Sequence, residues 1–581
     1  MGQEGFARSD LSRDGRVDDR AGREESTIDD RAGHEESTTL TRRTLLGGAA
    51  AAGAASLIAP AAGLASVRSG RRSVATRWLG ALAGESSPIA APVPFGLVGV
   101  QWSAPAPARI ELRAQAPSGR WSPWANAAVR GHDGDRQPAN EGVFGEPIWT
   151  GTAQAVQLRA PQAVHGVRLY FVSVTTPSGA WLAGAPPRAL PILDAGPGQP
   201  PIIARAAWAG GQAKPVHRPE YGTVQLAFVH HTVNPNGYSA TAVPGMLRAI
   251  FDYHTYVRGF WDIGYNFVID AYGRIWEARA GGIDMAVVGA QAGAYNTEST
   301  GVSMLGDFMN VIPTPAAIAA LERLVAWKLS LHGVPSTGQV TVVVDPLGAQ
   351  YTRFPPGAHV SLPRVAGHRD GDTTDCPGNA LYDDLPAIRP HITSLAGTPA
   401  RLTIAAPAAA AGSAVAVSGQ LRSLSGAPLA GAPIEIQLMA PSGPPDTTIG
   451  TTQTSSDGSW SSAVTLPRNT LVRALHRPHP AAVSDWVEVA VAPALTLGVK
   501  SSSPLVLAGT VSPASPVTVY LYRAPHTGGK PVRQRRVKVS GGRFTAHLPT
   551  PRPGTYVAIA RSAADANTAA GASPPLTVTV P

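Results

Sequence analysis

The chain has 581 residues, which is too long for one ordinary hydrophobic core and predicts about three or four domains. Its 44% hydrophobic content excludes a wholly disordered chain, and 62 glycines, 54 prolines and only 6% aromatic residues favour short strands and turns over long helices. The formal net charge is +9, and from residue 494 onward there are ten basic residues and one acidic residue. Such a basic module suits nucleic acid, an anionic membrane or an acidic wall polymer, or it is simply a solvated surface.

The first 40 residues are polar and charged. They contain a near-duplication, in which residues 18–27 are repeated almost unchanged at residues 29–38. So little apolar surface cannot offset the entropy of ordering a chain. We therefore expect residues 1–40 to be a disordered leader.

Residues 41–67 resemble a twin-arginine (Tat) export signal. Arg42 and Arg43 precede an uncharged stretch rich in alanine and glycine, and residues 59–61 (Ala-Pro-Ala) form a candidate cleavage site. The alternative is an uncleaved anchor, because the stretch is long enough to span a bilayer, but its many small residues make a poor anchor. We expect a secreted or cell-wall associated protein, exported by a Tat-like route, with no permanent membrane anchor after cleavage and no nucleic-acid partner.

Residues 93–193 alternate in the manner of strands, for example at 97–102 and 109–113, and the runs are separated by proline and glycine turns. This pattern predicts a β-sandwich module. Its Trp121 and Trp124 suit stacking on sugar rings, although tryptophans are more often buried in a core.

A change of pattern follows at residues 202–394. Helical periodicity at 244–257 and 315–331 alternates with strand-like runs at 224–230, 265–270 and 301–306. These residues therefore predict an α/β domain.

The remainder returns to strands and contains a diverged internal repeat. Residues 415–419 correspond to 505–509, and residues 434–438 correspond to 517–521. We expect two Ig-like β-sandwiches, at residues 400–493 and at residues 494–581. The expected fold class is thus multidomain: a central α/β domain, with a mixed sheet and flanking helices, and β-sandwich modules on both sides.

Cys376 is the only cysteine, so no disulfide forms within the chain. It follows His368 by eight residues, and His230 ends an apolar strand pattern. A hydrolytic zinc site needs three protein ligands and an open fourth position, and thiolate and imidazole both suit zinc. Spacing alone leaves His231 and His254 as competing ligands, and it leaves a cysteine nucleophile or an idle buried thiol open.

Several motifs around these residues follow the order of a known family. They are Arg205-Ala206-Ala207-Trp208, Val229-His230-His231-Thr232, Trp261-Asp262-Ile263-Gly264-Tyr265-Asn266-Phe267, Tyr295-Asn296, Gly301-Val302-Ser303-Met304-Leu305-Gly306-Asp307-Phe308 and the segment from His368 to Pro377. This series resembles the peptidoglycan recognition protein and type 2 amidase family, whose catalytic members are zinc-dependent N-acetylmuramoyl-L-alanine amidases. The resemblance covers residues 202–392.

The resemblance implies that His230, His368 and Cys376 hold Zn²⁺. Tyr265 matches the family's tyrosine that faces the reacting water and the tetrahedral intermediate, and Thr374 stands where family members have lysine or threonine. Both hydroxyls are suited to donate to an oxyanion or to position water. The implied protein is an exported zinc amidase that cleaves the amide between N-acetylmuramic acid and L-alanine. Its expected partners are peptidoglycan and, through the basic C-terminal module, anionic wall polymers.

The alternative is a non-catalytic peptidoglycan-binding or recognition protein, or a wall scaffold. Binding-only members usually lack the cysteine ligand, so Cys376 and Tyr265 favour catalysis. Two departures stand out: Gln291 replaces a frequent family histidine, which puts substrate contacts of that loop in doubt, and Ser303 stands where some bacterial relatives have a catalytic glutamate.

Three other polar residues are expected outside the catalytic set. His231 should face away from His230, because neighbouring strand residues point to opposite faces. His254 lies on the apolar face of its helix and is expected in the core. Arg279 is expected to be solvated, with contact to an anionic substrate group as the alternative.

Overall fold

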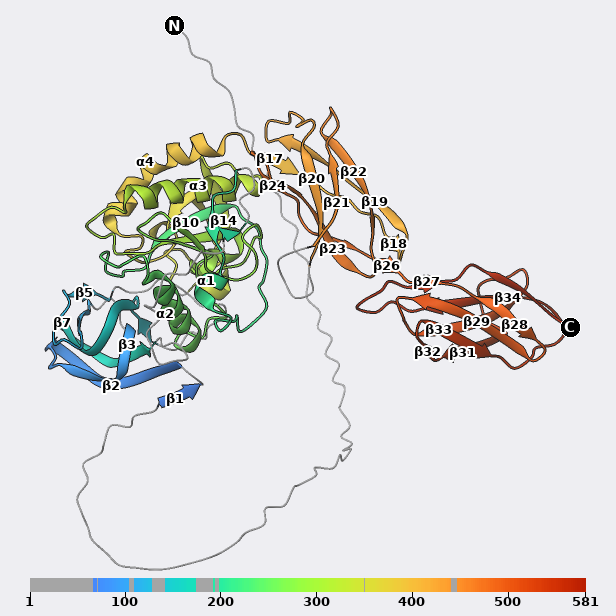
Figure 1. Ribbon diagram of the computed structural model, residues 1–581, viewed down its shortest axis with the longest axis horizontal. Helices are drawn as coiled ribbons and strands as arrows, with labels where there is room; N and C mark the ends of the chain where they lie inside the picture. The colour runs from blue at the N-terminus through green and yellow to red at the C-terminus, as the bar shows by residue number, and fades with distance from the viewer. Residues whose placement is uncertain are drawn as a thin grey trace, which may run out of the picture. The chain divides into compact units, whose positions relative to one another are not determined.

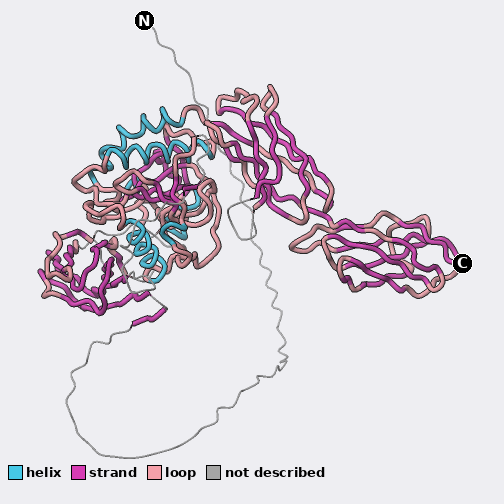
Figure 2. The backbone as a smooth tube through the Cα atoms, viewed as in Figure 1, coloured by secondary structure: helices cyan, strands magenta, loops and turns pink. Residues whose placement is uncertain are grey.

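Helices are confined to the middle of the described chain, and both flanks consist of strands, in the computed structural model (Figures 1 and 2). The structure describes residues 66–69, 72–103, 109–127, 142–173, 192–193, 198–349, 351–439 and 447–581. The leader expected at residues 1–40 therefore lies outside the described residues. The export signal expected at residues 41–67 also does, apart from its last two residues.

The N-terminal β domain is a seven-stranded sheet with the order β1-β2-β7-β3-β6, in which β4 pairs with β7 and β5 pairs with β4. Its strands are β1 (Ser66–Ser69), β2 (Arg72–Glu85), β3 (Ile89–Trp102), β4 (Glu111–Gln115), β5 (Ala125–Asn126), β6 (Val143–Phe144) and β7 (Ile148–Ser173). The domain begins before residue 93, since β1 and β2 belong to the same sheet.

The long strands of this sheet bend at irregularities in register. Between β2 and β7 the register shifts around Gly80 and before Gly84, and these two glycines have φ values of 78° and 68°. Bulges with glycine in the left-handed region bend a strand and increase its twist. One hydrogen-bonded sheet thus folds around its own core, in which the rings of Phe95 and Phe171 meet at 4.9 Å.

The central domain is built on a mixed sheet with the order β16-β10-β13-β11-β12-β9-β8. Its strands are β8 (Ile192–Leu193), β9 (Ile202–Ile203), β10 (Leu226–His231), β11 (Phe267–Ile269), β12 (Ile275–Glu277), β13 (Ser299–Met304) and β16 (Val365–Gly367). The four strands β16, β10, β13 and β11 are parallel, and β12 returns antiparallel to β11. The mixed sheet that the sequence predicts is confirmed.

Helices cover both faces of this sheet (Figure 1). They are α1 (Ala206–Ala209), α2 (Val243–Tyr256), α3 (Pro315–Leu331) and α4 (Asn379–Ala396). Alternate residues of a strand point to opposite faces. Accordingly, Val229 and Val302 pack with α3 and α4, whereas Val268 packs with α2.

Three short 3₁₀ helices and a hairpin complete the domain. They are η1 (Gly293–Glu298), η2 (Pro346–Gly348), η3 (His368–Asp370), β14 (Gln339–Val343) and β15 (His359–Pro363). The predicted helices at 244–257 and 315–331 are confirmed within one residue, and the Thr314 hydroxyl accepts the Ala317 N–H at the start of α3. Helix α4 was not predicted.

Two β modules follow, each with its own core, and their strand pairs are antiparallel except for the parallel pair β18 and β26. The first has β17 (Ala400–Leu402), β18 (Ala409–Ala410), β19 (Ala414–Ser423), β20 (Pro433–Leu438), β21 (Thr447–Gln453), β22 (Ser459–Thr465), β23 (Thr470–His476), β24 (Ala482–Val483), β25 (Val487–Val489) and β26 (Val491–Ala492). The second has β27 (Ala494–Leu495), β28 (Gly498–Ser502), β29 (Leu505–Ser512), β30 (Val517–Arg523), β31 (Arg533–Val537), β32 (Val539–Ser540), β33 (Arg543–His547), β34 (Gly554–Ser562), β35 (Gly571–Ala572) and β36 (Leu576–Val580).

The strands of the internal repeat occupy equivalent places in the two modules. In the first module β19 pairs with β22 while β20 lies between β21 and β23, and in the second β29 pairs with β33 while β30 lies between β31 and β34. The repeat detected in the sequence therefore reflects two copies of one arrangement of strands. Within the described residues, no helix has the length and apolar character needed to cross a membrane.

Candidate metal centre

The predicted ligands come from neighbouring parallel strands of the central sheet. His230 is the penultimate residue of β10, and His368 directly follows β16, which pairs with β10 through Val229 and Gly367. In open sheets of this kind, ligands bind at the carboxyl ends of the strands. Cys376 stands on the loop after η3 and is 146 residues from His230 in the chain. The sheet thus brings together ligands that lie far apart in the sequence.

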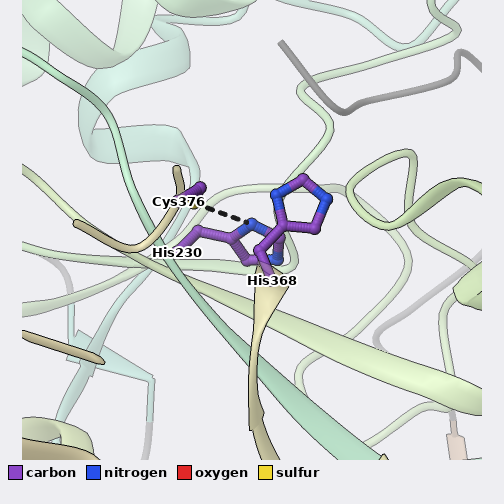
Figure 3. Close-up of side chains that lie close together, drawn as sticks. All are labelled: His230, His368 and Cys376. Carbon is purple, nitrogen blue, oxygen red and sulfur yellow. Dashed lines mark hydrogen bonds between the residues drawn. The ribbon is translucent and has the colours of Figure 1, made fainter. Parts of the chain in front are cut away.

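The three side chains converge on one point (Figure 3). One donor atom of each residue lies within 4.8 Å of the others, and the two imidazole centroids are 4.5 Å apart. The Cys376 Sγ lies 3.6 Å from His230 Nδ1. Both histidines are fully buried and Cys376 is 2% exposed. A buried group of two nitrogens and one sulfur is a donor set that zinc prefers.

Gln291 fixes the orientation of His230. The Gln291 Oε1 lies 2.5 Å from His230 Nε2, and its Nε2 donates to Ser299 Oγ at 2.8 Å. Because the Ser299 hydroxyl already donates to the Tyr295 carbonyl, the amide cannot be reversed without losing a bond. The His230 Nε2 must therefore donate to Gln291, and Nδ1 is the ring atom that a metal ion would bind.

Asp372 has the same relation to His368. Its Oδ2 lies 2.8 Å from His368 Nε2, and both side chains are fully buried. Burial raises the pKa of Asp372 well above its usual range. The Asp372 Oδ1 has no hydrogen-bond partner among the described residues. A carboxylate behind a histidine ligand holds the ring and increases its basicity, so this pair also fits a metal site.

Hydrogen bonds hold both the thiol and the backbone of Cys376. The His231 N–H donates to Cys376 Sγ at 3.4 Å, and the Cys376 N–H donates to Thr374 Oγ1 at 3.2 Å. The Arg369 N–H donates to the Cys376 carbonyl at 3.0 Å, which closes the loop. An N–H directed at sulfur favours the thiolate, which is the form that binds metal.

Tyr265 and Thr374 both lie beside the group. The Tyr265 ring is 1% exposed, and its centroid is 5.4 Å from that of His230 and 5.8 Å from that of His254. Thr374 is half-buried and touches the cysteine through the Cys376 N–H. Their side chains are therefore placed next to the first and the last of the three ligands.

The competing histidines lie outside the donor group. The His231 Nδ1 accepts the Phe308 N–H at 3.3 Å, and burial, followed by the neighbouring His230, lowers the pKa of His231 to about 3. The His254 Nδ1 accepts the Gly264 N–H at 2.9 Å inside the core. Both rings are buried and are used by the fold.

The expectation of a solvated Arg279 is wrong. The side chain is 7% exposed and its Nη1 donates to the Ile263 carbonyl at 3.2 Å. Sequence reasoning also gave Asp372 no role. The only signal for it was its position four residues after His368, which in a loop does not fix a contact. Gln291, whose replacement of a family histidine puts the substrate contacts of its loop in doubt, supports His230 with its side chain.

Two family models match parts of the chain. A family model described as N-acetylmuramoyl-L-alanine amidase matches residues 220–379, which include all three donor residues. A second, described as Rv3811 N-terminal galactose-binding domain-like, matches residues 61–187 and therefore includes β1 and β2.

Individual relatives match the central domain. Peptidoglycan-recognition protein LB of Drosophila melanogaster is 27% identical over 207 residues, covering 36% of this chain and 76% of that protein. N-acetylmuramoyl-L-alanine amidase of Homo sapiens is 30% identical over 201 residues, covering 34% of this chain and 30% of that protein. The structure of wild-type Drosophila PGRP-LB is matched with 25% identity and a TM-score of 0.25, over 32% of this chain and 92% of that one.

Proposed function

Because the chain contains a domain of the N-acetylmuramoyl-L-alanine amidase family at residues 220–379, we propose that it is an exported zinc-dependent amidase of peptidoglycan. It hydrolyses the amide between N-acetylmuramic acid and L-alanine. The observation that carries this proposal is the convergence of His230, His368 and Cys376 within 4.8 Å. Peptidoglycan as the partner is supported by the family and by relatives named for peptidoglycan recognition.

The residues of this chain have separate tasks in that reaction. When bound, zinc supplies a Lewis acid that polarises the amide carbonyl and lowers the pKa of water. Gln291 and Asp372 hold the two imidazoles, and the His231 N–H holds the sulfur. Tyr265 and Thr374 offer hydroxyls to the charge that develops on the substrate oxygen.

Cys376 acts as a ligand in this proposal and not as a nucleophile. A nucleophilic thiol needs a neighbouring base that can exchange a proton with it. The His230 Nδ1 faces the sulfur at 3.6 Å, as a base would, but the imidazole of His368 converges on the same point and has no task in a cysteine–histidine pair. The arrangement therefore suits three metal ligands better than a cysteine–histidine pair.

Export and wall association complete the proposal, with the basic module binding anionic wall polymers. The ten basic residues from residue 494 onward make no ion pair within the described part of the chain. The single acid, Asp565, accepts the N–H groups of Asn567 and Thr568 and so belongs to a turn. Sedimentation of the protein with cell walls over a salt series measures this binding.

The deciding experiment measures zinc content and stem-peptide release for the purified mature chain and for Cys376→Ala. We expect stoichiometric zinc and release with the wild type, and loss of both with the variant, because two imidazoles alone hold zinc weakly. His359→Ala serves as the matched control, since His359 is exposed on β15.

The possible outcomes distinguish the amidase from the non-catalytic binding protein and test the ligand set. A wild-type chain with neither zinc nor release contradicts the amidase proposal, and zinc without release indicates the non-catalytic binding protein. Full activity of Cys376→Ala would remove the cysteine from the ligand set.

A further inference from the structure

A cavity of about 310 Å³ lies beside the metal centre, at the same edge of the central sheet. Val233 and Asn236, from the loop after β10, and Asp307 and Asn310, from the loop after β13, line one side. The N-terminal β domain lines the other side and contributes two tryptophans, Trp124 and Trp149, to the lining.

His231 connects this cavity to the metal centre. The Asp307 Oδ1, in the cavity wall, lies 3.9 Å from His231 Nδ1. The backbone N–H of His231 donates to Cys376 Sγ at 3.4 Å. His231 therefore lies between the cavity wall and the thiol and contacts both.

Trp124 and Trp149 are half-buried, and Trp149 packs with part of its surface against the hydrophobic core that includes α2. The guanidinium carbons of Arg113 and Arg159 lie 4.6 Å and 4.4 Å from the Trp124 ring centroid. The Trp149 backbone N–H donates to Asn234 Oδ1 at 2.8 Å. The two cation–π contacts restrict the Trp124 ring, and its place in the cavity lining shows that part of the ring stays accessible.

The polar part of the wall is equally fixed. The Asn236 side chain exchanges two hydrogen bonds of 2.8 Å with the backbone of Asp307, which ties the two loops together. Asp307 also accepts the Met309 N–H, at 3.0 Å. Asn310 is exposed at the rim. The cavity therefore offers amide and carboxylate groups but, among its lining residues, no lysine or arginine.

Backbone strain coincides with this cavity. Among the described residues, Val233 is the non-glycine residue with positive φ, at 55°, and it is 3% exposed. A β-branched residue in this region is strained, and such strain persists where surrounding contacts hold it, commonly at functional sites. Asn234 supplies those contacts, since it joins Trp149 to the Thr232 hydroxyl.

We infer that this cavity is a saccharide subsite, which binds one pyranose ring of the glycan strand that carries the reacting muramic acid. Flat aromatic faces pack on the C–H faces of a sugar, and amide and carboxylate groups bind its hydroxyls. The absence of lysine and arginine from the lining argues against a phosphate or a free carboxylate as the ligand. The identity of the strand rests on the proposed amidase function, whereas the saccharide chemistry rests on the cavity alone.

The test uses a β-1,4-linked N-acetylglucosamine tetrasaccharide as the probe, and calorimetry with the full mature chain. We expect Trp124→Ala to weaken binding roughly tenfold, because one aromatic contact to the sugar is lost. Trp121→Ala is the matched control: Trp121 belongs to the same hairpin region and stacks on the same Arg113, at 5.0 Å, but does not line the cavity. Thermal melting of both variants verifies folding.

Three outcomes would overturn the inference. They are no measurable binding by the wild type, equal binding by the wild type and Trp124→Ala, or an equal loss with Trp121→Ala, which would assign the effect to the hairpin. Displacement of the tetrasaccharide by free stem peptide would make the cavity a peptide site and would overturn it as well.

The subsite and the amidase proposal fail separately. Release of stem peptide from a muropeptide with a single sugar, compared between the wild type and Cys376→Ala, reports on the metal centre. Tetrasaccharide binding without such release by the wild type supports the subsite while contradicting the amidase proposal. Release by the wild type without tetrasaccharide binding supports the amidase proposal and contradicts the subsite.

Discussion

Two buried polar clusters differ in the way their groups are satisfied: one lies within the central domain, and the other joins that domain to β23 of the first C-terminal module. One is the metal centre. The other, the lysine cluster, consists of Lys328 on α3, Asp284 and Arg473. The Lys328 Nζ donates to the carbonyls of Ile283 and Met285 at 2.7 Å each, and Arg473 pairs with Asp284 at 2.6 Å.

Both clusters contain strongly shifted pKa values. Burial lowers the pKa of Lys328 to about 7, with Arg473 adding to the shift and Asp284 opposing it, and burial raises the pKa of Asp372 well above its usual range. In the lysine cluster the ammonium and guanidinium groups meet oxygen acceptors, whereas in the metal centre two imidazoles and a thiol face one another. A shifted pKa alone thus indicates only that a group is buried. Metal-ligand atoms that converge on one point indicate a metal site.

The largest effect expected for a residue behind the ligands is on zinc affinity. Asp372→Ala should weaken zinc binding roughly 10- to 100-fold, because His368 loses the carboxylate that orients it. Competition with a chelator of known affinity measures the change. Asp375→Ala is the control, since this acid is exposed on the same loop. Equal zinc affinity of Asp372→Ala and the wild type would show that the carboxylate is only structural.

A smaller effect is expected at Thr374. Thr374→Val keeps the shape of the side chain and removes the hydroxyl, so kcat for stem-peptide release should fall about tenfold while zinc content stays constant. Thr373→Val, at the exposed neighbouring position, is the control. Loss of zinc together with activity would instead indicate that the hydroxyl serves only to hold the Cys376 N–H.

The lysine cluster should respond to pH in stability and not in zinc content. The native pKa of Lys328 is lowered from 10.5 to about 7, so between these pH values the unfolded chain binds more protons and the wild type gains stability as pH rises. Below pH 7 the ammonium is charged in both states, and its burial destabilises the fold in full.

Lys328→Met lacks this titration. We therefore expect the free energy of unfolding of the wild type, measured from pH 6 to pH 10, to rise relative to that of the variant. The rise should reach up to about 1.4 kcal/mol per pH unit above pH 7. Lys214→Met, at an exposed lysine, should follow the wild type. Parallel curves for the wild type and Lys328→Met would contradict the depressed pKa.

Local patterns explain what could be predicted of the fold. Helix α3 has a proline at its first position, a threonine cap and an apolar face, all of which act within a few residues. Helix α4 carries Pro386 and Pro390 inside its span, and prolines at those places argue against a helix in any reading of local pattern. Its burial against α3, through residues such as Leu385 and Ile388, outweighs that preference.

The candidate site shows the same contrast between residues that local motifs predict and residues whose role depends on tertiary contacts. His230, His368 and Cys376 were predicted because they stand within motifs of recognisable order. Gln291 and Asp372 were not, because their role depends on contacts between segments: Gln291 meets His230 across 61 residues, and Asp372 meets His368 only through the shape of the loop. Likewise, Trp124 and Trp149 line one cavity because the loops after β10 and β13 lie against the N-terminal β domain.

The position of β16 links metal binding to the stability of the central sheet. This strand is at the edge of the central sheet and pairs with β10 through only three residue pairs. His368 follows it immediately, so a metal ion shared with His230 fastens the edge strand to its neighbour. Removal of the metal would leave β16 weakly attached, and its release would expose the backbone groups of β10, which are a template for aggregation. A metal ion bound at this place would thus also stabilise the edge of the central sheet.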